Sequence, residues 1–172
     1  MEKTGNGMDV AISTASVKLY RIEQREEGCR AALEEAGAEV VAEEKGLSPE
    51  EGLANAQDLL SAETELDGIF GSFSNLVIGA GNALKEADRK DVAVSGIDAD
   101  RAVIQLILDG YVTAVAAQFP SQQAELITQA AADVIAGEDV DPDQQDLLPT
   151  RTVNAGNAEA RHEEIWGEPL GS

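Results

Sequence analysis

The sequence predicts an α/β fold in which a doubly wound parallel sheet of about five to six strands carries helices on both faces. The main observation is that short apolar runs and longer segments of helical periodicity alternate nearly from end to end. This alternation is typical of βαβ units with right-handed crossovers, which build a parallel sheet. The apolar runs are also almost continuous, as expected for strands buried on both faces. At 172 residues, the chain has the size of one ordinary domain.

The first part of the chain predicts two strands and two helices. Residues 10–13 and 38–42 are short apolar runs of the kind that form strands. Between them, residues 18–36 carry an apolar stripe at helical spacing, which predicts a long amphipathic helix. The second helix is expected to start at Ser48-Pro49-Glu50-Glu51. Serine suits the N-cap there, proline the first helical position and the second glutamate the capping box.

The middle of the chain continues the alternation of strands and helices. The helix after the third strand is expected to be capped by Ser72 or Ser74 and to run to about Ala87. Another helix, over residues 100–108, is expected to stop at Gly110, because glycine readily adopts the left-handed backbone that ends many helices. The strands of this part are expected at residues 66–70, 91–96 and 112–117.

The last part of the chain holds one more clear helical pattern. Residues 120–135 begin with proline and carry apolar side chains at helical spacing, which predicts a helix. Residues 138–145 are expected to form an acidic loop, and residues 147–153 an extended segment. Residues 161–172 are mostly polar and carry the single Trp166, so we expect them to form a frayed tail.

The charge of the chain limits its partners. Thirty-three acidic residues face twelve basic ones, for a formal net charge of -21. Such a chain is unsuited to nucleic acid or to an anionic membrane surface, which both need Lys and Arg. Its apolar runs are all broken before the roughly 18 residues that a membrane span needs, so no membrane insertion is expected. A solvated acidic surface explains the charge, and adaptation to a salt-rich habitat is the alternative.

Three polar residues are each placed just past an apolar strand-like run, at one expected edge of the sheet. Asp98 and Gln118 each end an apolar strand-like run, and Arg25 lies near the start of the first helix. In an open parallel sheet, ligands bind at the carboxyl ends of the strands. A guanidinium, a carboxylate and an amide gathered there predict a hydrogen-bonding site for a small polar molecule. No nucleophile–base pair accompanies them, so a binding module rather than an enzyme is expected.

Each of these residues also has a simpler interpretation when it is taken alone. Arg25 is equally compatible with a surface ion pair to Glu26 or Glu51. Asp98 is compatible with an N-cap for the helix that follows, and Gln118 with an ordinary loop residue. Their joint placement at the strand ends favours the site.

Other motifs carry less chemistry, and neither a cofactor nor a metal is expected. Ile78-Gly79-Ala80-Gly81-Asn82-Ala83 is a poor match to a dinucleotide loop, because it lies inside a helix pattern and lacks the third glycine. Small residues that let this helix sit close to the sheet explain it better. His162 has no partner nearby in the sequence, and the single Cys29 is expected to be a small core residue. A solvated face is expected for the carboxylates Glu26, Glu27, Glu34 and Glu35.

Five segments of the chain, taken in order, carry a resemblance to a known family. They are Arg25 to Cys29, Asp67 to Ala80, Val94 to Asp98, Ile107 to Pro120, and Leu148 to Asn157. The first is similar to the Arg-x-x-Gly-aromatic motif of type I periplasmic sugar-binding proteins of the ribose- and galactose-binding group. The second is similar to that family's central strand and the helix after it, and the third to its Val-x-Gly-hydrophobic-Asp segment. The fourth is similar to the family's Gln-x-Pro run, and the fifth to its closing strand.

The resemblance implies a flavodoxin-like lobe of a two-lobed protein. It covers about residues 8–160, so residues 1–160 are expected to form the C-terminal lobe alone, without the first lobe. The start, Met1-Glu2-Lys3-Thr4-Gly5, shows no signal peptide, although the resemblance implies a periplasmic or extracellular location. Because half of the family's ligand contacts come from the other lobe, weak or no sugar binding is expected from this chain by itself.

The resemblance also implies roles for individual residues. Arg25, Asp98 and Gln118 carry over directly as groups that hold sugar hydroxyls. Phe73 carries over by position only, and its ring would stack on the apolar face of the sugar. The chain departs from the family pattern where a cysteine replaces an aromatic residue and alanines replace glycines; these positions are Cys29, Ala99 and Ala124.

The implied function is binding of a sugar-like molecule for an ABC-type importer, whose permease would be the protein partner. The helix over residues 122–135 packs on the first lobe in intact relatives. Here its stripe of Ile127, Ala131 and Val134 must pack back on this lobe, pair with a second copy in a homodimer, or stay exposed. The alternatives are the effector-sensing lobe of a lactose-repressor-type regulator and a flavodoxin- or receiver-like domain. The DNA upstream of Met1 would distinguish the binding lobe of an importer from the repressor lobe, because the former predicts a signal peptide and first lobe there and the latter a DNA-binding head.

Overall fold

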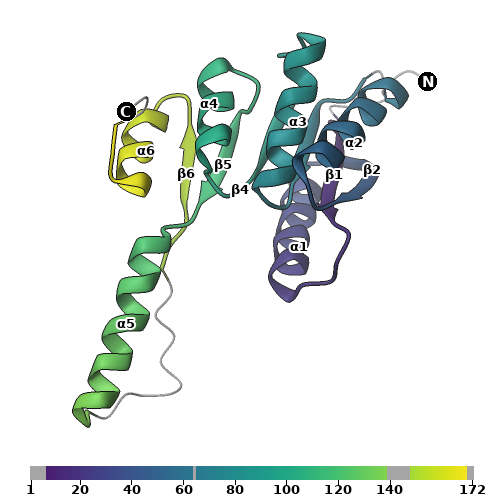
Figure 1. The fold of residues 1–172 in the computed structure, drawn as a ribbon. Helices are drawn as coiled ribbons and strands as arrows, with labels where there is room; N and C mark the ends of the chain where they lie inside the picture. Colours follow the sequence, from purple (N-terminus) through teal and green to yellow (C-terminus); the bar gives the residue numbers. More distant parts are fainter. Residues whose placement is uncertain (1–6, 64, 139–147, 170–172) are drawn as a thin grey trace.

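Six strands form one sheet in the computed structural model, which describes residues 7–63, 65–138 and 148–169 (Figure 1). The strand order is β2-β1-β3-β4-β5-β6, and every pair from β2 to β5 is parallel. The doubly wound parallel sheet predicted from the sequence is therefore confirmed. The strands are β1 (Asp9–Ala15), β2 (Glu39–Gly46), β3 (Gly68–Gly71), β4 (Ala93–Ile97), β5 (Ala114–Ala117) and β6 (Arg151–Asn154).

The last strand differs from the others in direction. β6 runs antiparallel to β5, with Val153 opposite Val115. The chain leaves the sheet at the end of β5 and returns at the same end, so β6 enters in the opposite direction without a crossover over the sheet.

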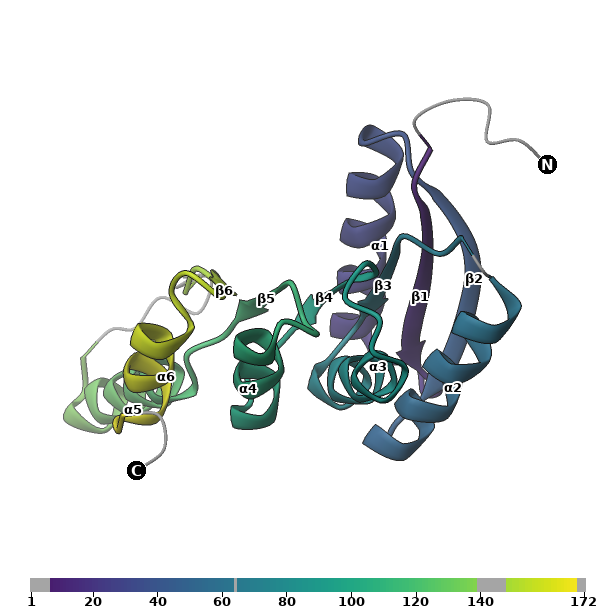
Figure 2. The same ribbon diagram turned by 90° about the horizontal axis from the view of Figure 1, so that it is seen from above.

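Helices cover the two faces of the sheet unequally (Figure 2). α1 lies on one face, where it packs on β1 and β2, and α2, α3, α4 and α6 lie on the other. β4 and β5 consequently bury alternate residues instead of reading as fully buried strands. The helices are α1 (Tyr20–Glu35), α2 (Pro49–Ala62), α3 (Ser74–Ala87), α4 (Arg101–Asp109), α5 (Pro120–Ala136) and α6 (Ala158–Trp166).

α2 and α3 approach each other closely through glycine. A Cβ atom built on Gly79 would lie 2.4 Å from the carbonyl carbon of Gly52 and 2.4 Å from the nitrogen of Leu53. The small-residue motif at Ile78 to Ala83 lies inside a helix, as expected. Its first glycine, however, allows a helix–helix contact rather than only a helix–sheet contact. The expected capping box of α2 is present, with Ser48 and Glu51 as its two members.

α5 extends away from the sheet as an arm (Figure 1). It buries none of its residues, and Ile127, Val134 and Ile135 are 70%, 61% and 87% exposed. Of the three arrangements considered for its apolar stripe, packing back on this lobe is therefore excluded in this structure. The acidic loop expected over residues 138–145 lies almost entirely outside the described residues, as does the start of the expected extended segment.

Two local expectations are wrong. The residue that caps α3 is Phe73, in extended conformation and without a side-chain cap hydrogen bond, rather than Ser72 or Ser74. The chain beyond Ala160 is not frayed over its described part, because α6 continues to Trp166. α6 packs on α4 and buries His162, which is only 2% exposed. His162 therefore lies among other residues of the fold and not in a solvated tail.

Candidate functional site

The four residues expected at the binding site lie together. Arg25, Phe73, Asp98 and Gln118 all line one cavity of about 350 Å³ at the carboxyl ends of the strands, which we call the rim cavity. α1 supplies the arginine, and the segments just after β3, β4 and β5 supply the other three. The convergence of Arg25, Asp98 and Gln118 that was predicted from their places in the sequence is thus observed, and Phe73 joins them.

One hydrogen bond and one ion pair join three of these side chains directly. Gln118 Nε2 donates to Asp98 Oδ1 over 2.6 Å, and Arg25 Nη1 lies 3.5 Å from Asp98 Oδ2. Arg25 Nη1 also donates to the Ser72 carbonyl oxygen over 3.0 Å. The described structure therefore pairs Arg25 with Asp98 rather than with Glu26 or Glu51. Both members of this ion pair remain partly exposed, at 16% and 25%, so a ligand can reach them.

The backbone at Asp98 is unusual. Its φ of 75° lies in the left-handed region, which residues other than glycine rarely adopt, although Asp and Asn do so most readily. The conformation is held by a hydrogen bond from the Asp98 nitrogen to the Ala116 oxygen, 2.9 Å long. The N-cap of α4 is Asp100, so Asp98 is not the capping residue. Strained backbone of this kind is concentrated at functional sites.

Apolar side chains and a second arginine, which were not expected from the sequence, complete the rim cavity. Arg21 lies four residues before Arg25, a spacing that places both on one side of a helix and that could have revealed it. The apolar wall next to Phe73 is formed by Ala15, Leu19, Ile22 and Leu47. A cavity that combines an apolar wall with a few convergent polar groups is typical of a small-molecule site.

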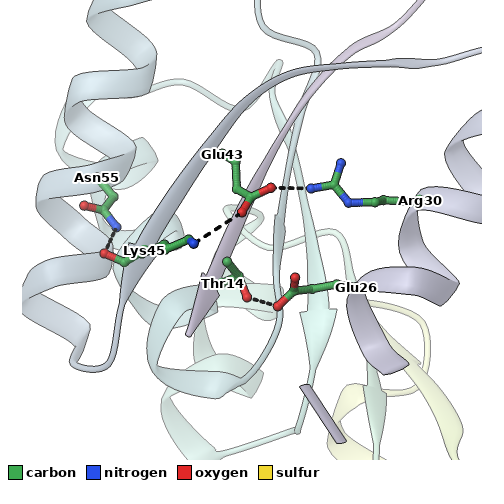
Figure 3. Close-up of polar contacts among 6 residues, drawn as sticks. All are labelled: Thr14, Glu26, Arg30, Glu43, Lys45 and Asn55. Carbon is green, nitrogen blue, oxygen red and sulfur yellow. Dashed lines mark hydrogen bonds and ion pairs between the residues drawn. The ribbon is translucent and has the colours of Figure 1, made fainter. Parts of the chain in front are cut away.

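A polar network fixes α1 against the sheet (Figure 3). Thr14 Oγ1 on β1 donates to Glu26, and Arg30 on α1 pairs with Glu43 on β2. Glu43 in turn lies 4.0 Å from Lys45 Nζ. Since Arg25 lies on the same helix, these contacts also position its guanidinium at the rim cavity.

Glu26 does not belong to a solvated face, contrary to expectation. Burial against the sheet raises the pKa of its carboxyl, and the neighbouring Glu43 raises the pKa further. Glu27, Glu34 and Glu35 are exposed, as expected.

Cys29 is only half-buried on α1, yet burial raises the pKa of its thiol from 9.0 to about 11. Because the thiolate is the reactive form, iodoacetamide at pH 8 should label the folded protein about 100-fold more slowly than the urea-unfolded chain. Mass spectrometry of quenched samples measures both rates. Equal rates in the two states would contradict the raised pKa.

The same shift has a consequence for stability. The folded-state pKa lies above the unfolded value, so the contribution of Cys29 to stability is complete below pH 9 and is lost as the pH rises towards about 11. Cys29→Ser should remove this part of the pH dependence in urea unfolding. A Cys29→Ser protein whose stability still falls equally between these pH values would show another group to be responsible.

The described residues also bear on metal binding and on membrane insertion. Within residues 7–63, 65–138 and 148–169, no three His, Cys, Asp or Glu side chains are grouped so that they could hold a metal ion. In the same part of the chain, no helix has the length and hydrophobicity required to cross a membrane.

Comparison with known proteins identifies relatives of the same architecture. The D-ribose/D-allose-binding protein of Pseudomonas aeruginosa is 28% identical over 146 residues, which cover 84% of this chain and 46% of that protein. A Bacillus halodurans solute-binding protein solved with bound myo-inositol aligns with a TM-score of 0.81 and 26% identity, over 91% of this chain and 54% of that one. An Actinobacillus succinogenes protein with bound D-allose aligns with a TM-score of 0.82 and 24% identity, covering 91% and 55%.

The chain spans about half the length of the curated relatives it matches. The family model described as "Periplasmic binding protein domain" matches residues 1–139, which is most of the chain. The sheet order, the cavity at the strand ends and this match agree, and the chain belongs to the periplasmic binding protein family.

Proposed function

We propose that this chain is the ligand-binding lobe of a solute-binding protein that delivers a sugar-like molecule to an ABC-type importer. In this proposal it binds without chemical transformation and works in the periplasm or outside the cell. The observation that carries the proposal is the rim cavity, where a guanidinium, a carboxylate and an amide meet beside an aromatic ring. Relatives named for ribose and allose binding support the choice of a sugar.

The chemistry of the rim cavity suits a sugar. Hydroxyl groups both donate and accept, so Asp98 would accept from them while Arg25 and Gln118 would donate to them. Bonds in which one partner is charged are roughly twice as strong as neutral ones. Phe73 would stack on the apolar face of the ring. The net charge of -21 disfavours strongly anionic ligands.

Affinity is expected to be low for the lobe by itself. Relatives are about twice as long, and the missing contacts reduce the gain from binding while the ligand still loses its freedom. In the proposal, the apolar stripe of α5 meets a further protein surface, either a first lobe or a second copy of this chain, and an importer permease is the final partner. We expect dissociation constants of about 10 mM for the lobe alone, by order of magnitude.

A melting screen tests the proposal. The panel is D-ribose, D-allose, D-arabinose and myo-inositol, the compounds named for relatives and related structures. At roughly 20 times the dissociation constant, a ligand stabilises the folded state by about 1.8 kcal/mol, which raises the melting temperature by about 4–7 °C. At least one member of the panel should do so.

The control separates binding from the general effect of osmolytes. Sugars at high concentration also stabilise proteins by exclusion from the surface, as does trimethylamine N-oxide, which has no hydroxyl groups. Binding requires a shift above that of trimethylamine N-oxide at equal osmolality, together with saturable changes in the NMR spectrum of the protein. A panel in which every sugar behaves like the osmolyte would overturn the proposed function.

A further inference from the structure

A second cavity lies beside the rim cavity and shares two of its residues. This cavity, of about 290 Å³, is lined by Asp98 and Gln118 and also by Trp166 of α6; we call it the indole cavity. We propose that it is a subsite for a second sugar ring, so that the ligand of this chain is a two-ring saccharide rather than a single sugar. This inference rests on the proposed function.

The fold holds the indole of Trp166 at the wall of the cavity. The Arg101 guanidinium lies 4.9 Å from the centre of the indole ring, and Arg101 is also paired with Glu168. The carbonyl oxygen of Glu168 accepts a hydrogen bond from His162 Nδ1, 3.0 Å away, and His162 is buried. Arg101 of α4, together with His162 and Glu168 near the C-terminus, therefore orients the ring. Trp166 nevertheless remains 40% exposed and is not part of the hydrophobic core cluster.

The remaining lining groups suit a neutral polyol. Gln123 and Ser74 supply donors and acceptors, and Asp100 supplies a second carboxylate next to Asp98. The two carboxylates disfavour an anionic ligand, while both accept hydrogen bonds from hydroxyls. An aromatic ring beside such groups offers a flat apolar surface for one face of a sugar ring. The volume approaches the lower end of small-molecule cavities, which is adequate for one ring but not for a large ligand.

The two cavities are neighbours because Asp98 and Gln118 line both of them. The hydrogen bond between Gln118 Nε2 and Asp98 Oδ1 lies at their common wall. A glycosidic linkage that passes this pair would place one ring against Phe73 and the other against Trp166. A single ring would fill one cavity and leave the other to water.

Trp166 also provides the readout, because it is the single tryptophan of the chain. The experiment titrates the protein with D-glucose and with maltose, cellobiose, trehalose and sucrose, following indole fluorescence and, in parallel, protein NMR shifts. We expect at least one disaccharide to bind at least tenfold more tightly than D-glucose and to change the fluorescence saturably, with the same midpoint by both methods.

Three variants complete the test. Trp166→Ala should reduce affinity for that disaccharide to the level of D-glucose while leaving D-glucose binding within twofold. Trp166→Phe, which keeps a flat ring, should retain most of the preference as measured by NMR. Val134→Ala, an exposed change on α5 outside both cavities, should change neither affinity. Circular dichroism and melting temperatures establish that each variant is folded.

The outcomes separate the two proposals. Disaccharides that bind no better than single sugars, or that bind equally well to Trp166→Ala, overturn the subsite and leave the proposed function standing. Binding of a disaccharide without any change in indole fluorescence also overturns the subsite. If neither these saccharides nor the four compounds of the melting screen bind, both proposals fail together.

Discussion

Gly79→Ala is expected to destabilise the protein by about 3 kcal/mol and to lower its melting temperature by about 6–12 °C. The added methyl group would lie 2.4–2.6 Å from backbone atoms of Gly52 and Leu53. Backbone atoms cannot rotate away as a flexible side chain can, so α2 and α3 must separate, and contacts along both helices are lost. The expected loss exceeds the gain of roughly 1 kcal/mol that alanine brings to a helix interior. Urea unfolding followed by circular dichroism measures the change.

Gly28→Ala is the matched control. Gly28 also lies inside a helix, but a Cβ atom at this position meets nothing within 4 Å. This variant should therefore be more stable than the original by about 0.5–1 kcal/mol, from helix propensity alone. If the two variants are equally stable, α2 and α3 move apart at no cost in free energy. That result would contradict the claim that the two helices require glycine at position 79.

Asp98→Asn is expected to weaken saccharide binding at least tenfold, which corresponds to about 1.4 kcal/mol. The change removes the charge that strengthens hydrogen bonds from ligand hydroxyls and the ion pair with Arg25. Asparagine is chosen because it tolerates the left-handed backbone at this position, where φ is 75°. NMR titration with the panel sugar that binds the original protein most tightly measures the dissociation constant.

Asp133→Asn makes the same chemical change on α5, where Asp133 accepts a hydrogen bond from Gln129. It removes one negative charge without touching either cavity, so it should leave the dissociation constant within twofold. Equal weakening by both variants would mean that net charge governs binding. Unchanged affinity in Asp98→Asn would remove Asp98 from the site.

The order of strands and helices could be predicted because local signals agreed with the tertiary structure. Apolar runs placed the strands, and Ser48 with Glu51 marked the start of α2. α6 was missed because its sequence carries no apolar stripe: it buries only Ala158 and His162, and it forms by packing on α4. Tertiary contacts, rather than propensity, stabilise such short helices.

The sequence also could not reveal that one face of β4 and β5 is left uncovered by helices. The residues on this face are small. A run of small residues has the same sequence pattern whether or not a helix covers the strand, so the pattern does not predict exposure. The residues include Ala93, Ser95, Ala114 and Ala116. The periodicity of burial depends on where α1 lies, and α1 packs mainly on β1 and β2.

The candidate site could be predicted in part, because strand ends converge whatever the length of the helices between them. Their positions at strand ends predicted that Asp98 and Gln118 lie together, and the start of the first helix placed Arg25 near them; all three line the same cavity. The sequence could not reveal the left-handed backbone of Asp98, which depends on the neighbouring strand through the Ala116 oxygen. It also could not place Trp166, because the indole reaches its cavity only through the docking of α6.

The α5 arm is joined to the sheet by Gln118, Phe119 and Pro120 in direct succession. Phe119 is buried, and the Arg151 guanidinium lies 5.6 Å from the centre of its ring, so the arm is rooted between the outgoing and returning strands. A protein bound to α5 would therefore contact a helix whose first residue, Pro120, comes two positions after Gln118. Gln118 carries the amide at the shared wall of the two cavities. Binding of a protein to α5 and binding of a ligand in the two cavities would therefore involve adjacent residues of the chain.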